Sequence, residues 1–183
     1  MRLKALSLLD CEQVRQWRNE TLVSLRTPFL LTQEQQTKFY SEVICNRQAD
    51  ARYWGIFIEQ DTGYADSKLE STTRDILIGM CGLENISWEN RNAEISIILN
   101  PECHGKGYGT KAIELLLDQG FNYMNLENIF GECYYSNPAI GFWRNIITKY
   151  NAASCDLPQR KYYNGTYYDS LYFNINKSDF KER

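Results

Sequence analysis

Closely spaced cysteines are absent from this sequence, and histidine occurs only once, at His104. Structural zinc sites need several cysteine or histidine ligands in closely spaced pairs. The sequence therefore predicts no metal site. We expect the cysteines to be reduced, partly buried thiols of a cytoplasmic protein. The six cysteines are Cys11, Cys45, Cys81, Cys103, Cys133 and Cys155.

Long apolar runs are also absent. No stretch approaches the ~20 apolar residues that a membrane helix needs. The first residues, Met1–Lys4, do not open an apolar run of signal-peptide length. We therefore expect no membrane association.

An excess of positive charge is missing as well, because the net charge is −3. Binding to a phosphate backbone needs a broad basic face, so we expect no nucleic-acid partner. What the sequence does contain is apolar material, with 43% hydrophobic and 14% aromatic residues over 183 positions. This composition predicts a folded globular chain with a single domain spanning residues 1–183.

Hydrophobic periodicity and turn residues predict an α/β fold, a mixed sheet with helices on both faces, and they leave the strand pairing open. We expect Asp10 to cap a first helix, a capping box at Thr32-x-x-Gln35 to open a second one, and a hairpin turn at Asn164-Gly165. The expected strands are Leu3–Leu8, Tyr53–Glu59, Asp75–Leu83, Ala93–Leu99, Asn128–Tyr134 and material within Tyr162–Asn174. The expected helices are Cys11–Asn19, Thr32 to about Ile44, Thr110–Phe121 and a short one opening at Asn137-Pro138.

Two segments lack periodicity. Residues 60–74 are polar, and we expect a long mobile hairpin loop there that either connects two strands or covers a substrate. The chain after Tyr150 has a loop-like composition until Tyr162.

The segment Glu102–Thr110 carries the chemistry. Gly105, Gly107 and Gly109 alternate between an expected strand and an expected helix. Glycine permits backbone angles at which successive N–H groups converge on an anion, and the new helix adds unpaired donors and its positive dipole end. Lys106 adds a positive charge. The segment therefore predicts a diphosphate-binding loop, while a strand-to-helix turn without a ligand is the alternative.

Two familiar phosphate loops do not match this segment. A Walker A motif needs Ser or Thr directly after Gly-Lys, and the chain has Gly-Lys-Gly. The dinucleotide fingerprint needs Gly-x-Gly-x-x-Gly, and the chain has Gly-x-Gly-x-Gly.

Residues Ala93–Trp143 resemble the GNAT superfamily of N-acetyltransferases. The superfamily signature Gln/Arg-x-x-Gly-x-Gly/Ala reads here as His104-x-x-Gly107-x-Gly109, with histidine in place of glutamine or arginine. The later segment Asn137–Trp143 is similar to the Asn…Ala-Ile segment of that group.

The early residues Trp17–Asn19 and Pro28–Thr32 resemble the branch that acetylates the N-termini of ribosomal proteins. That branch also includes enzymes that act on sugar amines and small molecules. The resemblance implies transfer of an acetyl group from acetyl-CoA, as co-substrate, to a primary amine: a protein N-terminus, an amino sugar or a small molecule.

The resemblance also implies a mostly antiparallel sheet with a splayed central strand pair, and a set of coenzyme contacts. Backbone groups of the fourth strand bind the pantetheine, and the glycine loop binds the diphosphate. His104 is an auxiliary phosphate contact or a plain loop residue. The implied contacts are Ile97, Ile98, Leu99, His104, Gly105, Lys106, Gly107, Tyr108, Gly109, Thr110, Asn137, Phe142 and Trp143.

Acetyl transfer needs the amine as its free base, and it expels a thiolate. Glu94 is the candidate base, because relatives place a carboxylate on this strand. Relatives often use a tyrosine as the acid at the position that is Trp143 here. Indole is not a useful acid, so Tyr134 is the candidate, with Tyr135 and Tyr108 as alternatives.

The missing tyrosine and the altered His104 leave a second hypothesis open, a weak or inactive acyl-CoA-binding protein with a sensing or structural role. Transfer of a longer acyl group, or to a hydroxyl, is a third. The sequence specifies no acceptor, and it allows a monomer or a homodimer.

Overall fold

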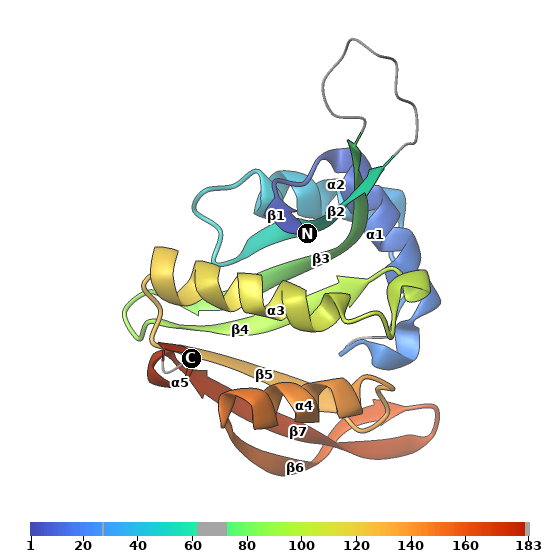
Figure 1. Ribbon diagram of the computed structural model, residues 1–183. Helices are drawn as coiled ribbons and strands as arrows, with labels where there is room; N and C mark the ends of the chain where they lie inside the picture. Colours follow the sequence, from blue (N-terminus) through green and yellow to red (C-terminus); the bar gives the residue numbers. More distant parts are fainter. Residues whose placement is uncertain (27, 62–72, 182–183) are drawn as a thin grey trace.

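A computed structural model describes residues 1–26, 28–61 and 73–181 of the chain (Figure 1). One seven-stranded sheet, in the order β1-β2-β3-β4-β5-β7-β6, forms its centre. Neighbouring strands are antiparallel except for β4 and β5, which are parallel. The strands are β1 (Arg2–Lys4), β2 (Arg52–Asp61), β3 (Thr73–Ser87), β4 (Asn92–Leu99), β5 (Asn128–Tyr134), β6 (Ala153–Tyr163) and β7 (Thr166–Asn176).

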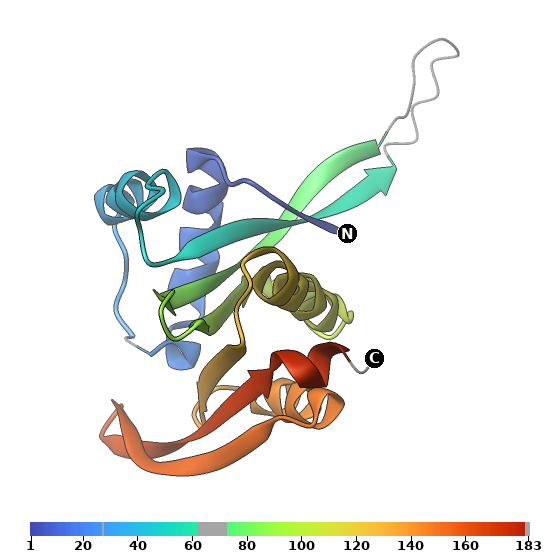
Figure 2. The same ribbon diagram turned by 90° about the vertical axis from the view of Figure 1, so that its left-hand side faces the viewer.

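Helices cover both faces of this sheet (Figure 2). One face carries α1 and α2, and the other carries α3, α4 and α5. The expected α/β architecture with helices on both faces is confirmed. The α-helices are α1 (Leu8–Glu20), α2 (Gln33–Phe39), α3 (Tyr108–Asp118), α4 (Ile140–Tyr150) and α5 (Lys177–Lys181). Short 3₁₀ turns lie at Leu22–Ser24 and Pro101–Cys103, and π-helical turns at Tyr40–Ile44 and Gln119–Tyr123 continue α2 and α3.

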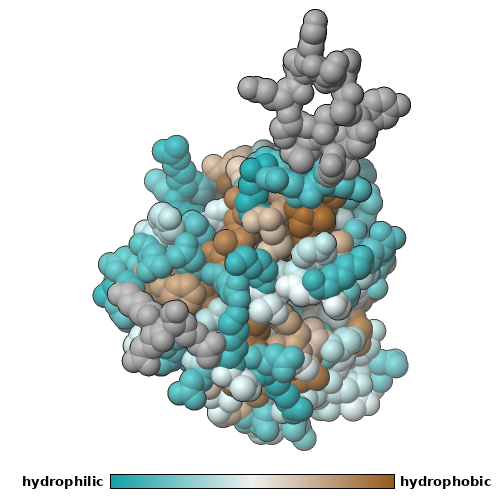
Figure 3. Space-filling model, viewed as in Figure 1, coloured by the Kyte–Doolittle hydropathy of each residue, from teal (hydrophilic) through white to brown (hydrophobic). Residues whose placement is uncertain are grey.

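Two apolar clusters hold the layers together, one on each side of the sheet. The larger lies between the sheet and α3 and α4. The expected apolar stripe is fully buried there, with Ala112, Ile113, Leu116 and Leu117 on α3 and Phe121 in the segment that continues it. The smaller cluster seats α1 on β2 and β3 through Cys11, Val14, Trp17, Phe57, Leu77 and Met80. On the face drawn in Figure 3, hydrophobic residues form separate patches bordered by hydrophilic side chains.

The first two helix starts differ in how well the sequence predicted them. Thr32 caps α2 in a capping box with Gln35, as expected. The expectation of Asp10 as the cap of α1 is wrong, because Ser7 is the cap and Asp10 closes the box from the third helical position. Ser7 starts the helix early, so the first strand ends at Lys4 rather than at Leu8.

Two later expectations are also corrected. The fourth helix begins at Ile140 rather than at Asn137-Pro138, because Asn137 Oδ1 accepts from the Ala139 N–H and forms a turn first. The segment after Tyr150 is strand β6 and not a loop. It is mostly exposed and irregular, so it lacks the alternation that marks a strand. The hairpin turn at Asn164 (φ 47°) and Gly165 (φ 82°) is confirmed.

The segment that was expected to form a mobile loop lies mainly outside the described residues. The structure describes its two ends, where β2 and β3 pair antiparallel as far as Asp61 and Thr73.

Candidate active site

Strands β4 and β5 diverge in the middle of the sheet (Figure 1). They pair only from Asn92 to Glu94 on β4 and from Asn128 to Phe130 on β5. The rest of β4 stays bonded to β3 as far as Leu99. The main-chain groups of Ile97–Leu99 on the β5 side are therefore open to an extended ligand that would act as an added strand.

The glycine loop follows β4 directly and leads into α3. In the described part of the chain, none of the amides of residues 105–110 donates to a protein acceptor. Gly107 is the N-cap of α3 and has no side-chain cap. Unpaired amides at a helix N-terminus, with the positive end of the helix dipole behind them, suit a diphosphate.

The three glycines serve different purposes. Gly105 and Gly107 have φ of 72° and 79°, and a Cβ on either would meet no atom within 4 Å. Backbone conformation, rather than crowding, therefore requires glycine at these two positions. A Cβ on Gly109 would lie 3.1 Å from the ring of Phe142. Gly109 thus lets α3 approach α4 closely.

The charged and polar residues of this loop face solvent. His104 and Lys106 are both exposed, and Tyr108 and Thr110 are partly exposed at the start of α3. An exposed lysine beside unpaired amides adds positive charge where a diphosphate would bind.

Glu94, the candidate base, lies at the last position where β4 pairs with β5, which is where the two strands begin to diverge. Its side chain is 9% exposed and forms an ion pair with Arg26. Asn85 Nδ2 donates to its second carboxylate oxygen at 2.9 Å. A buried carboxylate needs such partners, because burying an unpaired charge is costly.

Tyr134, the candidate acid, is the last residue of β5 and is buried. Burial and the carboxylate of Glu132 raise the pKa of Tyr134, while Arg26 and Arg160 act in the opposite direction. The phenol is therefore protonated at neutral pH, which suits a proton donor.

A buried lysine holds the surroundings of Tyr134 in place. Lys161 Nζ donates to the Val23 carbonyl at 2.6 Å and to Ser136 Oγ at 3.2 Å. It also lies 5.3 Å from the centre of the Tyr134 ring. Burial lowers the pKa of Lys161. These contacts fasten the segment after α1 to the end of β5.

The other residues expected to contact the coenzyme lie around the start of α4. Asn137 Nδ2 donates to the Ser24 carbonyl at 3.2 Å. Phe142 is partly buried beside Gly109, whereas Trp143 is buried with its ring 5.1 Å from that of Phe173. Trp143 therefore packs in the core beneath the site.

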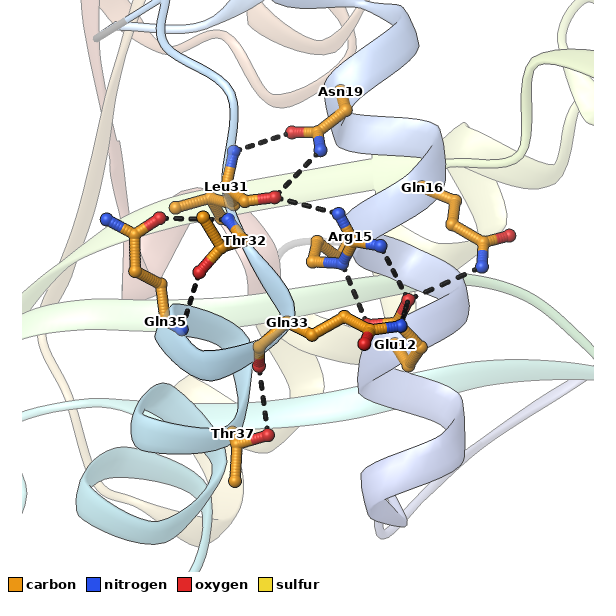
Figure 4. Close-up of polar contacts among 9 residues, drawn as sticks. All are labelled: Glu12, Arg15, Gln16, Asn19, Leu31, Thr32, Gln33, Gln35 and Thr37. Atoms are coloured by element: carbon orange, nitrogen blue, oxygen red, sulfur yellow. Dashed lines mark hydrogen bonds and ion pairs between the residues drawn. The ribbon is translucent and has the colours of Figure 1, made fainter.

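Polar contacts fix the connection between α1 and α2 that carries Arg26 (Figure 4). Asn19 bonds both main-chain groups of Leu31, at 2.9 and 3.0 Å. Arg15 adds a bond to the Leu31 carbonyl at 2.7 Å and also pairs with Glu12. Two hydrogen bonds from Arg15 lower the pKa of Glu12 to about 2.

Sequence reasoning missed Arg26, Glu132, Arg160 and Lys161. One available signal was the alternation Phe130-Glu132-Tyr134 along β5, which places a carboxylate on the same face as the candidate acid. The partners Arg26 and Arg160 come from irregular segments, and no local pattern marks them.

The described residues contain neither a cluster of metal ligands nor a membrane-spanning helix. No group of three or more His, Cys, Asp or Glu residues is placed to hold a metal ion. In the same residues, no helix is long and apolar enough to cross a membrane.

Comparison with known proteins gives a family and several relatives. The family model described as acetyltransferase (GNAT) domain matches residues 1–141. Spermidine N(1)-acetyltransferase of Escherichia coli (strain K12) is 28% identical over 109 residues, which cover 53% of this chain and 59% of that protein. The chain thus matches less than two thirds of that relative's length. The Vibrio cholerae enzyme of the same name is 39% identical over 62 residues, 34% of this chain and 36% of that protein.

A solved structure of spermidine N-acetyltransferase from Vibrio cholerae, in complex with CoA and spermine, has a TM-score of 0.77 to this chain. It is 22% identical, and the match covers 98% of this chain and 97% of the other. At this identity the likeness shows a shared fold.

Proposed function

Because the chain belongs to the acetyltransferase (GNAT) domain family, we propose that it transfers the acetyl group of acetyl-CoA to a primary amine. The observation that carries this proposal is the splay of β4 and β5 next to the unpaired amides of residues 105–110. Together they offer an extended edge for the pantetheine and a cradle for the diphosphate.

The coenzyme contacts follow from this arrangement. The backbone of Ile97, Ile98 and Leu99 binds the pantetheine amides. The amides of residues 105–110, with Lys106 and His104 nearby, bind the diphosphate. Asn137 and Phe142 form the wall on the α4 side, and Trp143 packs in the core beneath them.

The acceptor side supplies the proton chemistry. Glu94 takes the proton that the amine loses as its nitrogen attacks the thioester carbonyl, directly or through a water molecule. Tyr134 gives a proton to the departing thiolate. Holding the two substrates in attack geometry supplies a large part of the rate.

We propose a cationic small-molecule amine of the polyamine type as the acceptor. The matched relatives are named as spermidine acetyltransferases, and Glu94 and Glu132 are nearly buried carboxylates that can bind a cation. The N-terminus of a ribosomal protein, or an amino sugar, is the competing acceptor class. The inactive acyl-CoA-binding protein is not favoured, because the family and the relatives are acetyltransferases.

The proposal also covers the number of domains, the location in the cell and the oligomeric state. We propose one domain over residues 1–183, because all seven described strands join one sheet. We propose a cytoplasmic location, because all six cysteines are free thiols. We propose a monomer or homodimer, which native mass spectrometry with acetyl-CoA would distinguish.

The test measures thiol release from acetyl-CoA with a panel of acceptors, followed by mass spectrometry of the product. The panel contains 1-aminobutane, 1,4-diaminobutane, spermidine, glucosamine and a peptide with a free N-terminus. We expect an acetylated polyamine as the main product. Binding of acetyl-CoA without thiol release across the whole panel would reject the enzymatic function.

The role of Glu94 has its own test. We expect Glu94→Gln to lower kcat/KM most at low pH, because the amine is then most protonated and needs a base. A pH series of kcat/KM for the variant and the natural sequence measures this. If the ratio of the two is constant across pH, Glu94 is not the base.

A further inference from the structure

Two carboxylates near Tyr134 are almost buried, and an arginine covers each of them. The Glu94 side chain is 9% exposed and pairs with Arg26, and the Glu132 side chain is 10% exposed and accepts from Arg160 Nε at 3.1 Å. The two arginine side chains are 50% and 53% exposed. In the other ion pairs of the described residues, the carboxylate side chains are 21–63% exposed. These two pairs therefore stand apart from ordinary surface pairs.

Both carboxylates lie on the same face of the sheet. Glu94 stands opposite Phe130 on β5, Glu132 is the next residue of β5 on that face, and Tyr172 of β7 stands opposite Glu132. The rings of Phe130 and Tyr172 stack with centres 5.8 Å apart. Strand geometry separates the two glutamate Cα atoms by about 8 Å. The face therefore presents two anions with aromatic surface beside them.

The arginines come from irregular backbone, while the glutamates are fixed in strands. Arg160 lies in the irregular stretch of β6 between Leu157 and Lys161, where pairing with β7 is interrupted and Gln159 has a φ of 51°. Arg26 lies in the connection after the turn Leu22–Ser24. Bulges and loops re-aim side chains, so both arginines can turn toward solvent while the strands stay paired.

Tyr134 lies within electrostatic reach of both pairs. Its phenol interacts with Glu132 and with the guanidinium groups of Arg26 and Arg160. Glu132 and the arginines of both ion pairs therefore lie near the candidate acid, and Glu94 joins this group through Arg26.

We propose that Arg26 and Arg160 occupy, in the free protein, the places that two ammonium groups of a dicationic acceptor take when it binds. Glu94 then holds the reacting amine, Glu132 holds the distal ammonium, and the methylene chain lies over Phe130 and Tyr172. This inference rests on the proposed function for its acceptor class.

Exchange of cations explains how nearly buried carboxylates can bind a substrate. Each carboxylate has a cationic partner before and after binding, so neither passes through an unpaired buried state, which is the costly one. An amine with one charge can replace only one arginine. Arg160 and Glu132 are therefore specificity-determining residues that favour acceptors with two or more positive charges.

The test measures acceptor binding by calorimetry on protein saturated with CoA. Because CoA carries no acetyl group, no turnover accompanies binding. The ligands are 1,4-diaminobutane and 1-aminobutane. Arg160→Gln is expected to bind the diamine about fivefold more tightly, because it removes the internal competitor, and to leave monoamine binding unchanged. Arg160→Lys should behave like the natural sequence. Arg2→Gln is the matched control, since Arg2 pairs with the more exposed Glu59 and Asp75 near the opposite edge of the sheet.

Glu132→Gln provides a second test, in which the preference for the diamine over the monoamine should disappear. Weaker or unchanged diamine binding by Arg160→Gln would overturn the inference, as would a preserved preference in Glu132→Gln. The inference and the proposed function fail separately. Turnover with unchanged diamine affinity in Arg160→Gln rejects the inference alone, whereas tighter diamine binding without turnover from acetyl-CoA in any variant rejects the function alone.

Discussion

Gly107 shows how one backbone angle determines the glycine loop that we propose as the coenzyme site. Its φ of 79° directs the chain into α3 while the neighbouring amides stay unpaired. The spacing of glycines in the sequence was sufficient to predict this loop, because the required conformation is local.

Gly107→Ala is expected to weaken acetyl-CoA binding and to destabilise the protein by about 1–2 kcal/mol, because a Cβ strains a left-handed residue. Gly165→Ala is the matched control, since Gly165 has a φ of 82° and equally open space but lies in the β6–β7 turn. Calorimetry with acetyl-CoA and denaturant unfolding separate the two effects. Equal affinities in both variants would show that the loop does not bind the coenzyme.

The ion-pair partner of Glu94 could not be predicted from the sequence. Its strand and its distance from the glycine loop were readable, but its partner Arg26 is 68 positions away in the sequence. Such a pairing depends on how α1 and its following segment pack on the sheet. Long-range contacts of this kind have no local pattern.

At the scale of elements, the connection between α1 and α2 depends on a small polar network. The Asn19 side chain forms hydrogen bonds with both main-chain groups of Leu31: its Oδ1 accepts from the Leu31 N–H, and its Nδ2 donates to the Leu31 carbonyl. The capping box at Thr32 was predicted from the sequence, because its residues are three apart. The contacts of Asn19 join residues that are 12 positions apart, and they were not predicted from the sequence.

Asn19→Ala is expected to lower the free energy of unfolding by about 1 kcal/mol, because Leu31 loses hydrogen bonds in a partly buried place. Gln16→Ala is the control from the same helix, since Gln16 is exposed and makes a 3.4 Å contact with Glu12. Urea unfolding of both variants measures the difference. Equal midpoints would mean that the Asn19 contacts contribute nothing to stability.

At the scale of the whole molecule, the sheet consists of two parts joined at three residue pairs of β4 and β5. The order of strands and helices was predictable from periodicity. The strand pairing was not, because periodicity identifies faces and leaves neighbours undetermined. The splay itself came from the family resemblance.

Acetyl-CoA bound at the splay would contact the α3 side and the α4 side together. We expect a concentration of about 100 times Kd to stabilise the protein by about 2.7 kcal/mol, which corresponds to a rise in Tm of about 5–10 °C. Thermal unfolding measures this, with adenosine as a control that lacks the diphosphate. An unchanged Tm at saturation would contradict binding to the native state.

Strand β6 lies at one edge of the sheet, where another chain could pair with it. Pro158 lacks an N–H and lies in the stretch where pairing with β7 is interrupted. At the opposite margin, β1 has three residues and carries the charged Arg2 and Lys4. Neither margin offers a long, regular ladder to another chain, so copies of this protein are protected from edge-to-edge aggregation.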